Sequence, residues 1–190
     1  MIIGIIGKKR VGKDTSADYL VDKYGFVKYS FGDPVKQICQ NIFDLTDEQL
    51  NTDKKDIIDE YLGVSPRQIF QIIGTDIFQY KIYNFFPELE KNIPKKQFWV
   101  KKFEKWYQNE TKENKNIKIV ISDIRFKHEY ECLKNLGATL IKIEKDTKLV
   151  DDHISENELN DVSNLDYYLE NNTTKENLYL KLDNIVKNIV

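Results

Sequence analysis

The sequence predicts an α/β protein built on a five-stranded parallel sheet. Short apolar runs of strand length alternate with helical segments along the chain, and this alternation is typical of a parallel sheet with right-handed crossovers. The first apolar run leads directly into a glycine-rich loop and a helix, an order that creates an anion-binding site. With 190 residues, 41% of them hydrophobic, the chain can bury a full core, so we expect a single domain over residues 1–190.

The N-terminal segment predicts a phosphate-binding loop. Residues 1–6 are a continuous apolar run, as in a strand buried on both faces, and residues 12–24 have the spacing of an amphipathic helix. Between them, residues 7–15 read GKKRVGKDT, which contains the G-x-x-x-x-G-K pattern of the P-loop. The backbone N–H groups of such a loop, together with the Lys13 ammonium, bind the phosphates of a nucleoside triphosphate.

Two carboxylates are candidate Mg²⁺ ligands beside this loop. Asp14 follows the P-loop lysine, where the motif usually has a Ser or Thr whose hydroxyl binds Mg²⁺, and Thr15 comes next. Residues 117–123 form an apolar strand that ends in Asp123, which is the Walker-B arrangement. Arg125 lies two residues further on, at the sheet edge where open α/β folds bind ligands.

The middle of the chain predicts a helical region. Asp33 as N-cap and Pro34 at the first helical position indicate a helix that runs through Phe43. Residues 44–62 are acidic and lysine-rich, and we expect them to be exposed and to contain an insertion. Residues 65–68 read Ser-Pro-Arg-Gln, which is the start of a further helix with a capping box.

That further helix carries a polar stripe. Arg67, Gln71 and Thr75 recur every four residues among apolar neighbours, which indicates either the lining of a ligand cleft or an ordinary solvated face. Gly74 weakens the helix, and close approach of a ligand or of a neighbouring backbone would explain it.

The other expected elements follow the same reading of periodicity and turn signals. They are an aromatic-rich helix over 95–107, an exposed polar connector over 108–118, strands over 27–31, 138–145 and 165–169, a helix starting near 156, a turn at 171–172 and a C-terminal helix capped at 173.

Composition excludes several classes of protein. A net charge of −2 argues against general nucleic-acid binding, and the sequence has neither an apolar run of membrane-spanning length nor a signal-peptide pattern, so we expect a soluble intracellular protein without a membrane partner. Cys39 and Cys132 are far apart and lack metal-ligand spacing, which suits reduced thiols in the cytoplasm.

Taken together, five motifs resemble the bacteriophage-type deoxynucleoside monophosphate kinases, a P-loop family. They are GKKRVGKDTSAD at 7–18, FGDPVK at 31–36, SPRQIFQIIGTD at 65–76, ISDIRFKHE at 121–129 and DDHISE at 151–156. The resemblance implies a three-layer α/β/α P-loop kinase fold, with a helical acceptor-binding insertion over 33–107 and a short lid over 146–160. It also implies transfer of the ATP γ-phosphoryl group to a deoxynucleoside monophosphate with Mg²⁺ as cofactor, and a viral gene whose product works in the host cytoplasm.

The resemblance also implies roles for individual residues. The ATP site would contain Lys8, Arg10, Val11, Gly12, Lys13, Asp14, Thr15 and Asn171, although Asn171 and Asn172 also fit a plain turn. The acceptor site would contain Asp33, Lys36, Arg67, Gln71, Thr75, Arg125, His153 and Glu156. Lys13, Asp33, Asp123 and Arg125 would act in catalysis, and Asp14 and Asp123 would bind Mg²⁺.

Two alternatives stay open from the sequence. One is a P-loop kinase for another small acceptor, such as dephospho-coenzyme A or a phosphorylated alcohol, although the Arg67/Gln71/Thr75 stripe suits a nucleotide better. The other is a non-catalytic ATP-binding subunit, which would not need Arg67, Asp33 and Arg125 to converge. Residues 145–160 contain no arginine, and their only basic residues are Lys145 and Lys148, so the sequence does not indicate which lid residues would bind phosphate. A homodimer is compatible with all three functions.

Overall fold

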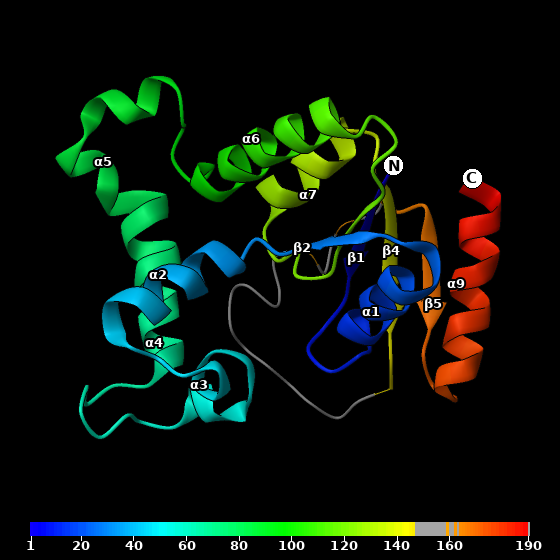
Figure 1. Ribbon diagram of the computed structural model, residues 1–190, viewed down its shortest axis with the longest axis horizontal. Coiled ribbons are helices and arrows are strands. Elements are labelled where there is room, and N and C mark those ends of the chain that lie inside the picture. Colours follow the sequence, from blue (N-terminus) through cyan, green and yellow to red (C-terminus); the bar gives the residue numbers. More distant parts are fainter. Residues whose placement is uncertain (147–158, 160–161, 163, 190) are drawn as a thin grey trace. The chain divides into compact units, whose positions relative to one another are not determined.

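A computed structural model describes residues 1–146, 159, 162 and 164–189 (Figure 1). The chain forms two compact units, one made of Met1–Ser30 with Tyr107–Val190 and the other of Phe31–Trp106. The first unit contains the sheet, and the second is helical. The second unit nearly coincides with the expected insertion over 33–107, and its role in acceptor binding stays a prediction. In the part of the chain that is described, no helix has the length and apolarity needed to cross a membrane.

The first unit is built on the five-stranded parallel sheet that the sequence predicts. The strands are β1 (Ile2–Ile6), β2 (Val27–Tyr29), β3 (Ile119–Ile121), β4 (Thr139–Glu144) and β5 (Tyr167–Glu170). Their order is β2-β3-β1-β4-β5, and every neighbouring pair is parallel. β1 lies at the centre and all its residues are buried, as its continuous apolar run indicates.

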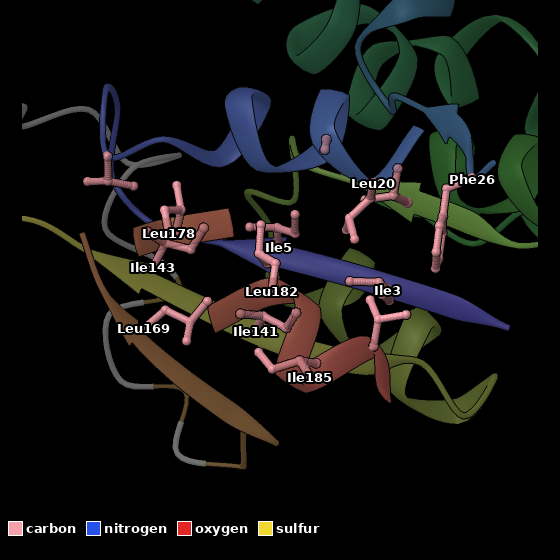
Figure 2. Close-up of a cluster of buried hydrophobic side chains, with 14 residues drawn as sticks. Ile3, Ile5, Leu20, Phe26, Ile141, Ile143, Leu169, Leu178, Leu182 and Ile185 are labelled. Atoms are coloured by element: carbon pink, nitrogen blue, oxygen red, sulfur yellow. The ribbon is translucent and has the colours of Figure 1, made fainter. Parts of the chain in front are cut away.

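Helices cover both faces of this sheet, which confirms the three-layer fold. On one face, α1 (Lys13–Tyr24) and α9 (Lys175–Ile189) pack on the strands, as Figure 2 shows. The buried side chains of this layer include Ile3, Ile5, Val120, Ile141, Ile143 and Leu169 from the strands and Leu20, Leu178, Leu182 and Ile185 from the helices.

The opposite face packs tightly around Gly4. A Cβ atom on Gly4 would lie 2.7 Å from Leu140 Cδ2, 2.8 Å from Ile124 Cδ1 and 3.4 Å from Leu133 Cδ1. Leu133 belongs to α7 (Lys127–Asn135), a helix that the sequence analysis did not anticipate. The expected connector over 108–118 is also partly helical, because α6 runs over Phe98–Glu113 instead of ending at 107. Residues 108–113 are polar on every side, so they lack the periodicity that would have identified them as helical.

The second unit consists of short helical segments. They are α2 (Asp33–Phe43), α3 (Asp47–Asn51), η1 (Asp53–Asp56), α4 (Pro66–Gln71), η2 (Ile72–Lys81), α5 (Ile82–Phe85), η3 (Pro87–Lys91) and the first part of α6. The cap of α2 is Gly32, and Asp33 lies in the first helical turn instead of capping it. The predicted capping box of α4 is confirmed, since Ser65 N donates to Gln68 Oε1 and Gln68 N donates to Ser65 Oγ.

Aromatic residues of α6 contribute to the core of the second unit. Phe103 and Trp99 are buried, and the Phe103 ring lies 5.4 Å from that of Phe31. Trp99 Nε1 donates a 2.7 Å hydrogen bond to the carbonyl oxygen of Gly74, in the wide π-helical turns of η2. A Cβ atom on Gly74 would approach Val35 to 3.2 Å, so protein side chains explain this glycine without a ligand.

A polar cluster joins α1 to α9 at the surface of the first unit. Asp183 accepts hydrogen bonds from the hydroxyls of Tyr19 and Tyr24, each at 2.7 Å, and from Lys23 Nζ at 2.8 Å. Desolvation raises the pKa of Asp183, but the hydrogen bonds from Lys23, Tyr24 and Tyr19 outweigh it and lower this pKa to about 2. The ionised carboxylate is therefore the form that stabilises the fold.

Substitution of Asp183 by Asn should reveal this contribution. At pH 7 we expect Asp183→Asn to lower the free energy of unfolding by ~1–2 kcal/mol, because hydrogen bonds to a charged acceptor are lost. Since the folded-state pKa is depressed, the difference between the two proteins should shrink as the pH falls from about 4 towards 2. Urea unfolding across this pH range measures it. Asp22→Asn, at an exposed position of α1, is the control, and an equal loss in that variant would contradict the assignment.

Candidate active site

The P-loop leaves β1 through backbone conformations that favour glycine. Gly7 has φ 155°, and a Cβ atom there would lie 2.4 Å from the carbonyl oxygen of Ile143 in β4. Gly12 has φ 106° and directly precedes α1. Arg10, between them, also has a positive φ of 65°. The first strand, the loop and the helix therefore have the geometry that phosphate binding at a helix N-terminus requires.

Lys13 lies over the loop. Its Nζ donates to the carbonyl oxygens of Gly7 at 2.6 Å and Lys8 at 2.7 Å. An ammonium group in this position adds positive charge to the loop, next to the partial positive charge at the N-terminus of α1. This is the arrangement that binds the β- and γ-phosphates in P-loop proteins.

The far side of the loop is fixed by Val11 and Asn171. The Val11 side chain is buried in the core, and its carbonyl oxygen accepts a 2.9 Å hydrogen bond from Asn171 Nδ2. The Asn171 backbone N–H in turn donates to the Glu144 carbonyl at the end of β4. Asn171 thus supports the P-loop directly, a contact that the sequence analysis did not anticipate.

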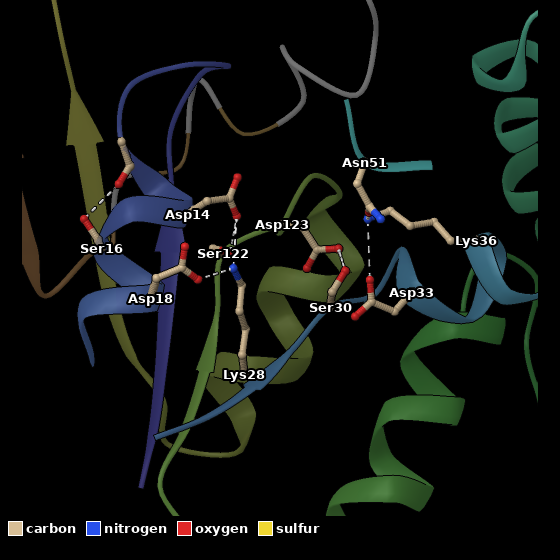
Figure 3. Close-up of polar contacts among 11 residues, drawn as sticks. Asp14, Ser16, Asp18, Lys28, Ser30, Asp33, Lys36, Asn51, Ser122 and Asp123 are labelled. Carbon is tan, nitrogen blue, oxygen red and sulfur yellow. Dashed lines mark hydrogen bonds and ion pairs between the residues drawn. The ribbon is translucent and has the colours of Figure 1, made fainter. Parts of the chain in front are cut away.

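Asp14 lies in a polar environment at the start of α1 (Figure 3). It accepts a 2.8 Å hydrogen bond from Ser122 Oγ, just after β3. Lys28 Nζ, from β2, lies 3.7 Å from Asp14 Oδ1 and 2.7 Å from Asp18 Oδ1. The Asp14 side chain is 78% exposed, so these contacts orient a carboxylate that solvent reaches.

Asp123 follows on the same chain segment as Ser122. Its Oδ2 accepts a 2.6 Å hydrogen bond from Ser30 Oγ, just beyond β2 (Figure 3). Both carboxylates are therefore oriented by serine hydroxyls at the carboxyl ends of strands. Two carboxylates beside a phosphate loop are the oxygen ligands that Mg²⁺ commonly uses, with phosphate oxygens and water completing its coordination.

Glu129 holds the chain that follows Asp123. It is 3% exposed, and its Oε2 accepts hydrogen bonds from the backbone N–H of Arg125 at 2.8 Å and of Phe126 at 3.1 Å. Burial raises the pKa of Glu129 to about 8; the negative charge of Asp123 acts in the same direction, and the two backbone hydrogen bonds oppose it. The exposed Arg125 side chain thus extends from a backbone that a buried carboxyl group holds.

Candidate acceptor residues lie in the second unit. Lys36 Nζ donates to Asn51 Oδ1 at 3.0 Å and lies 3.6 Å from Asp33 Oδ1 (Figure 3). Arg67 pairs with Asp56 through two N–H groups, one of them Nη2 at 3.1 Å from Asp56 Oδ2. The side chains of the Arg67/Gln71/Thr75 stripe are all half-buried, on α4 and the first turn of η2.

The structure thus brings together only part of the predicted site. The P-loop residues, with Thr15 half-buried in the first turn of α1, share the first unit with Asp123, Arg125 and Asn171. The second unit contains the predicted acceptor residues Asp33, Lys36, Arg67, Gln71 and Thr75. That they form one active site with the ATP-binding residues stays a prediction. His153 and Glu156 lie outside the described residues, as does most of the expected lid.

Sequence reasoning missed four residues that orient the site. Three of them contact the site carboxylates and come close to these only in the folded chain: Ser30, Ser122 and Lys28. Nothing in the sequence around these three residues indicates the contacts. A signal does exist for Glu129, because it stands three residues after the N-cap, where capping boxes have Glu or Gln. The cap itself is Phe126 instead of Ser or Thr, which conceals the pattern.

Asn171→Asp tests the support of the P-loop. The variant keeps the size of the side chain but replaces the donor to the Val11 carbonyl with an oxygen, so we expect the loop to distort and the Kd for ATP to rise ~10-fold or more, equivalent to about 1.4 kcal/mol. Calorimetric titration with ATP measures this. Asn172→Asp adds the same charge one residue on, where the side chain contacts Asp146, and should weaken ATP binding much less. Equal effects would mean that charge alone is responsible.

Comparison with known proteins finds several similar kinases. A family model for deoxynucleotide monophosphate kinases matches residues 1–62 and 45–182. A protein of Acanthamoeba polyphaga mimivirus assigned to these kinases is 38% identical over 192 residues, covering 99% of this chain and 97% of its own. The deoxynucleotide monophosphate kinase of Enterobacteria phage T4 is 25% identical over 239 residues, covering 98% of both chains.

The fold also matches a solved structure. Dephospho-CoA kinase from Campylobacter jejuni superposes with a TM-score of 0.50 at 15% identity, covering 99% of this chain and 96% of its own. This likeness supports the P-loop kinase fold and carries no information on the acceptor. The family match and the mimivirus relative do carry such information, and both span nearly the whole chain. The chain belongs to the deoxynucleotide monophosphate kinase family of phosphotransferases.

Proposed function

We propose that this protein transfers the γ-phosphoryl group of ATP to the phosphate of a deoxynucleoside monophosphate, giving the diphosphate and ADP. The observation that carries the proposal is the position of Lys13 over a P-loop flanked by the oriented carboxylates Asp14 and Asp123. The acceptor follows from membership of the family and from relatives that carry this activity in their names.

The P-loop would bind the phosphates of ATP. Its backbone N–H groups and the α1 N-terminus would bind the anion, and the Lys13 ammonium would exchange its two carbonyl contacts for phosphate oxygens. Asp14 and Asp123 would hold Mg²⁺, which when bound neutralises charge on the β- and γ-phosphates. Both carboxylates suit this ion because they are hard oxygen ligands already oriented by hydroxyl groups.

Arg67 is our candidate for binding the acceptor phosphate. Its fork already pairs with the two oxygens of Asp56, and two oxygens of a phosphate offer the same bidentate match with more charge. Gln71 and Thr75 would contact the nucleoside from the same stripe. Asp33 would orient the attacking phosphate oxygen, and Arg125 would bind the transferred group between the substrates.

Phosphoryl transfer at such a site needs little covalent participation by the protein. Phosphoryl transfer needs the two oxygens held in line, the developing charge neutralised and water excluded. Lys13 and Arg125 supply positive charge, and closure over the substrates, for which residues 146–160 are the candidate, would exclude water.

The setting of the reaction is part of the same proposal. ATP and deoxynucleoside monophosphates are the expected partners, in the cytoplasm of the host if the gene is viral, like those of the relatives. The chain carries a net charge of −2, which gives no general affinity for nucleic acid, and a homodimer is compatible with the site.

An ADP-release assay over the deoxynucleoside and ribonucleoside monophosphates and dephospho-coenzyme A tests the proposal. We expect turnover with at least one deoxynucleoside monophosphate and none with dephospho-coenzyme A. Lys13→Ala should be folded and lose the activity by at least ~100-fold, because the charge on the transferred group is no longer neutralised. Turnover with dephospho-coenzyme A alone would assign a different acceptor, and ATP binding without any turnover would indicate a non-catalytic subunit.

Arg67→Lys tests the acceptor assignment. The variant keeps the charge and loses the planar fork, so we expect the KM for the acceptor to rise ~10-fold or more while the KM for ATP changes less than about threefold. Steady-state kinetics with each substrate varied in turn measures both. Lys54→Ala, which removes an exposed ion pair with Glu48 in the same unit, should change neither constant. A similar rise in both KM values for Arg67→Lys would contradict the assignment.

A further inference from the structure

Glu129 makes contacts that exceed the needs of helix capping. A Glu at the third helical position normally reaches back to the N–H of the cap residue, which here is Phe126. Glu129 also accepts a shorter hydrogen bond, 2.8 Å, from the N–H of Arg125, one residue before the cap and outside the helix. The second contact serves the loop and not the helix.

Burial of the Glu129 carboxyl group is unfavourable by itself, which indicates that the loop conformation it stabilises is important. A buried carboxyl group loses its hydration, and the two backbone hydrogen bonds compensate only in part, as the raised pKa of Glu129 shows. Glu131, two residues further along α7, is exposed and bears no such cost. An apolar side chain at position 129 would pack without this penalty but would leave both N–H groups without their acceptor.

Glu129 is one of three anchors on the segment between β3 and α7. Ser30 holds the Asp123 side chain, and Ile124 is buried where its Cδ1 closely approaches Gly4 of β1. Glu129 then fixes the next two backbone N–H groups. Arg125 lies between the second and third anchors, so the direction in which its side chain leaves the backbone is fixed although the side chain itself is exposed.

We propose that Glu129 is a positioning residue for phosphoryl transfer, which acts by holding the backbone of Arg125 so that the guanidinium meets the transferred group. This inference rests on the function proposed above, because it requires a role for Arg125 in the reaction. Because Glu129 is buried, we expect it to contact neither substrate. Its effect should therefore appear in kcat and not in the affinity for ATP, and it should disappear when Arg125 is absent.

Single variants give the first test. We expect Glu129→Ala to lower kcat at least ~10-fold and to change the KM for ATP less than about threefold. Glu129→Gln keeps an acceptor oxygen at the same place and should retain at least about a third of wild-type kcat. Glu131→Ala is the matched control and should behave as wild type. If Glu129→Ala does not fold, Glu129→Met takes its place, since it fills the volume without an acceptor. Retained kcat in the folded variant would overturn the proposal.

A double-mutant cycle with Arg125→Ala gives the decisive test. We expect Glu129→Ala to change kcat less than about twofold in the Arg125→Ala background, because the group it positions is gone. Hydrogen exchange should at the same time show faster exchange of the amides at 125 and 126 in Glu129→Ala than in Glu129→Gln. Full multiplication of the two effects, or unchanged exchange, would overturn the inference while the proposed function stands. A wild-type protein that is inactive with every acceptor would instead overturn the proposed function, and this inference with it.

Discussion

The burial of β1 at the centre of the sheet is the constraint on which the site depends. All five residues of the strand are buried and pair with β3 on one side and β4 on the other, so the strand cannot shift without disrupting the whole sheet. Gly7, the next residue, must then leave the sheet directly against the Ile143 carbonyl, where a side chain would collide. The packing of the core therefore fixes the position of the first P-loop residue. This position is at the end of β1, which lies between β3 and β4, where open α/β sheets bind ligands.

The rest of the loop is held by contacts of different kinds. Val11 anchors it in the core through its side chain, Asn171 holds the Val11 carbonyl, and Lys13 spans the opening. Backbone N–H donors that are held in place before the ligand arrives need little reorganisation when it binds, and this makes them more effective than flexible groups of equal charge. Asp14 and Arg125 are exposed and Lys13 and Asp123 are half-buried, whereas Ser122 and Glu129, which orient parts of the site, are buried.

The parts of this fold that were predicted from the sequence are those with a local signal. The apolar run of β1, the P-loop motif and the carboxylate at the end of β3 each lie within a few neighbouring residues. Helix α7 was missed, and the partners of Asp14 and Asp123 were missed because they lie 108 and 93 residues away in the chain. For Gly74 the sequence indicates close approach of a ligand or of a neighbouring backbone, and it does not indicate the side chains of Val35 and Trp99 that pack there, because no local pattern shows them. Pairings between distant residues depend on the sheet order, which periodicity does not determine.

The unusual Asp14 becomes intelligible in this context. A standard P-loop supplies a hydroxyl after its lysine, and the Walker-B strand supplies a carboxylate. Here the carboxylate is Asp14, and the hydroxyl of Ser122, at the end of β3, donates to it. Compared with the standard motif, the carboxylate is therefore on the P-loop helix and the hydroxyl is at the end of the β3 strand. The two groups still contact each other at the same edge of the sheet. Because Asp123 adds a second carboxylate next to Ser122, the site has one more negative charge than the standard pair, and Lys28, 3.7 Å from Asp14, offsets part of it. The substitution in the motif is therefore compensated by Lys28 on β2 and by Ser122 just after β3, which favours a functional P-loop over a degenerate one.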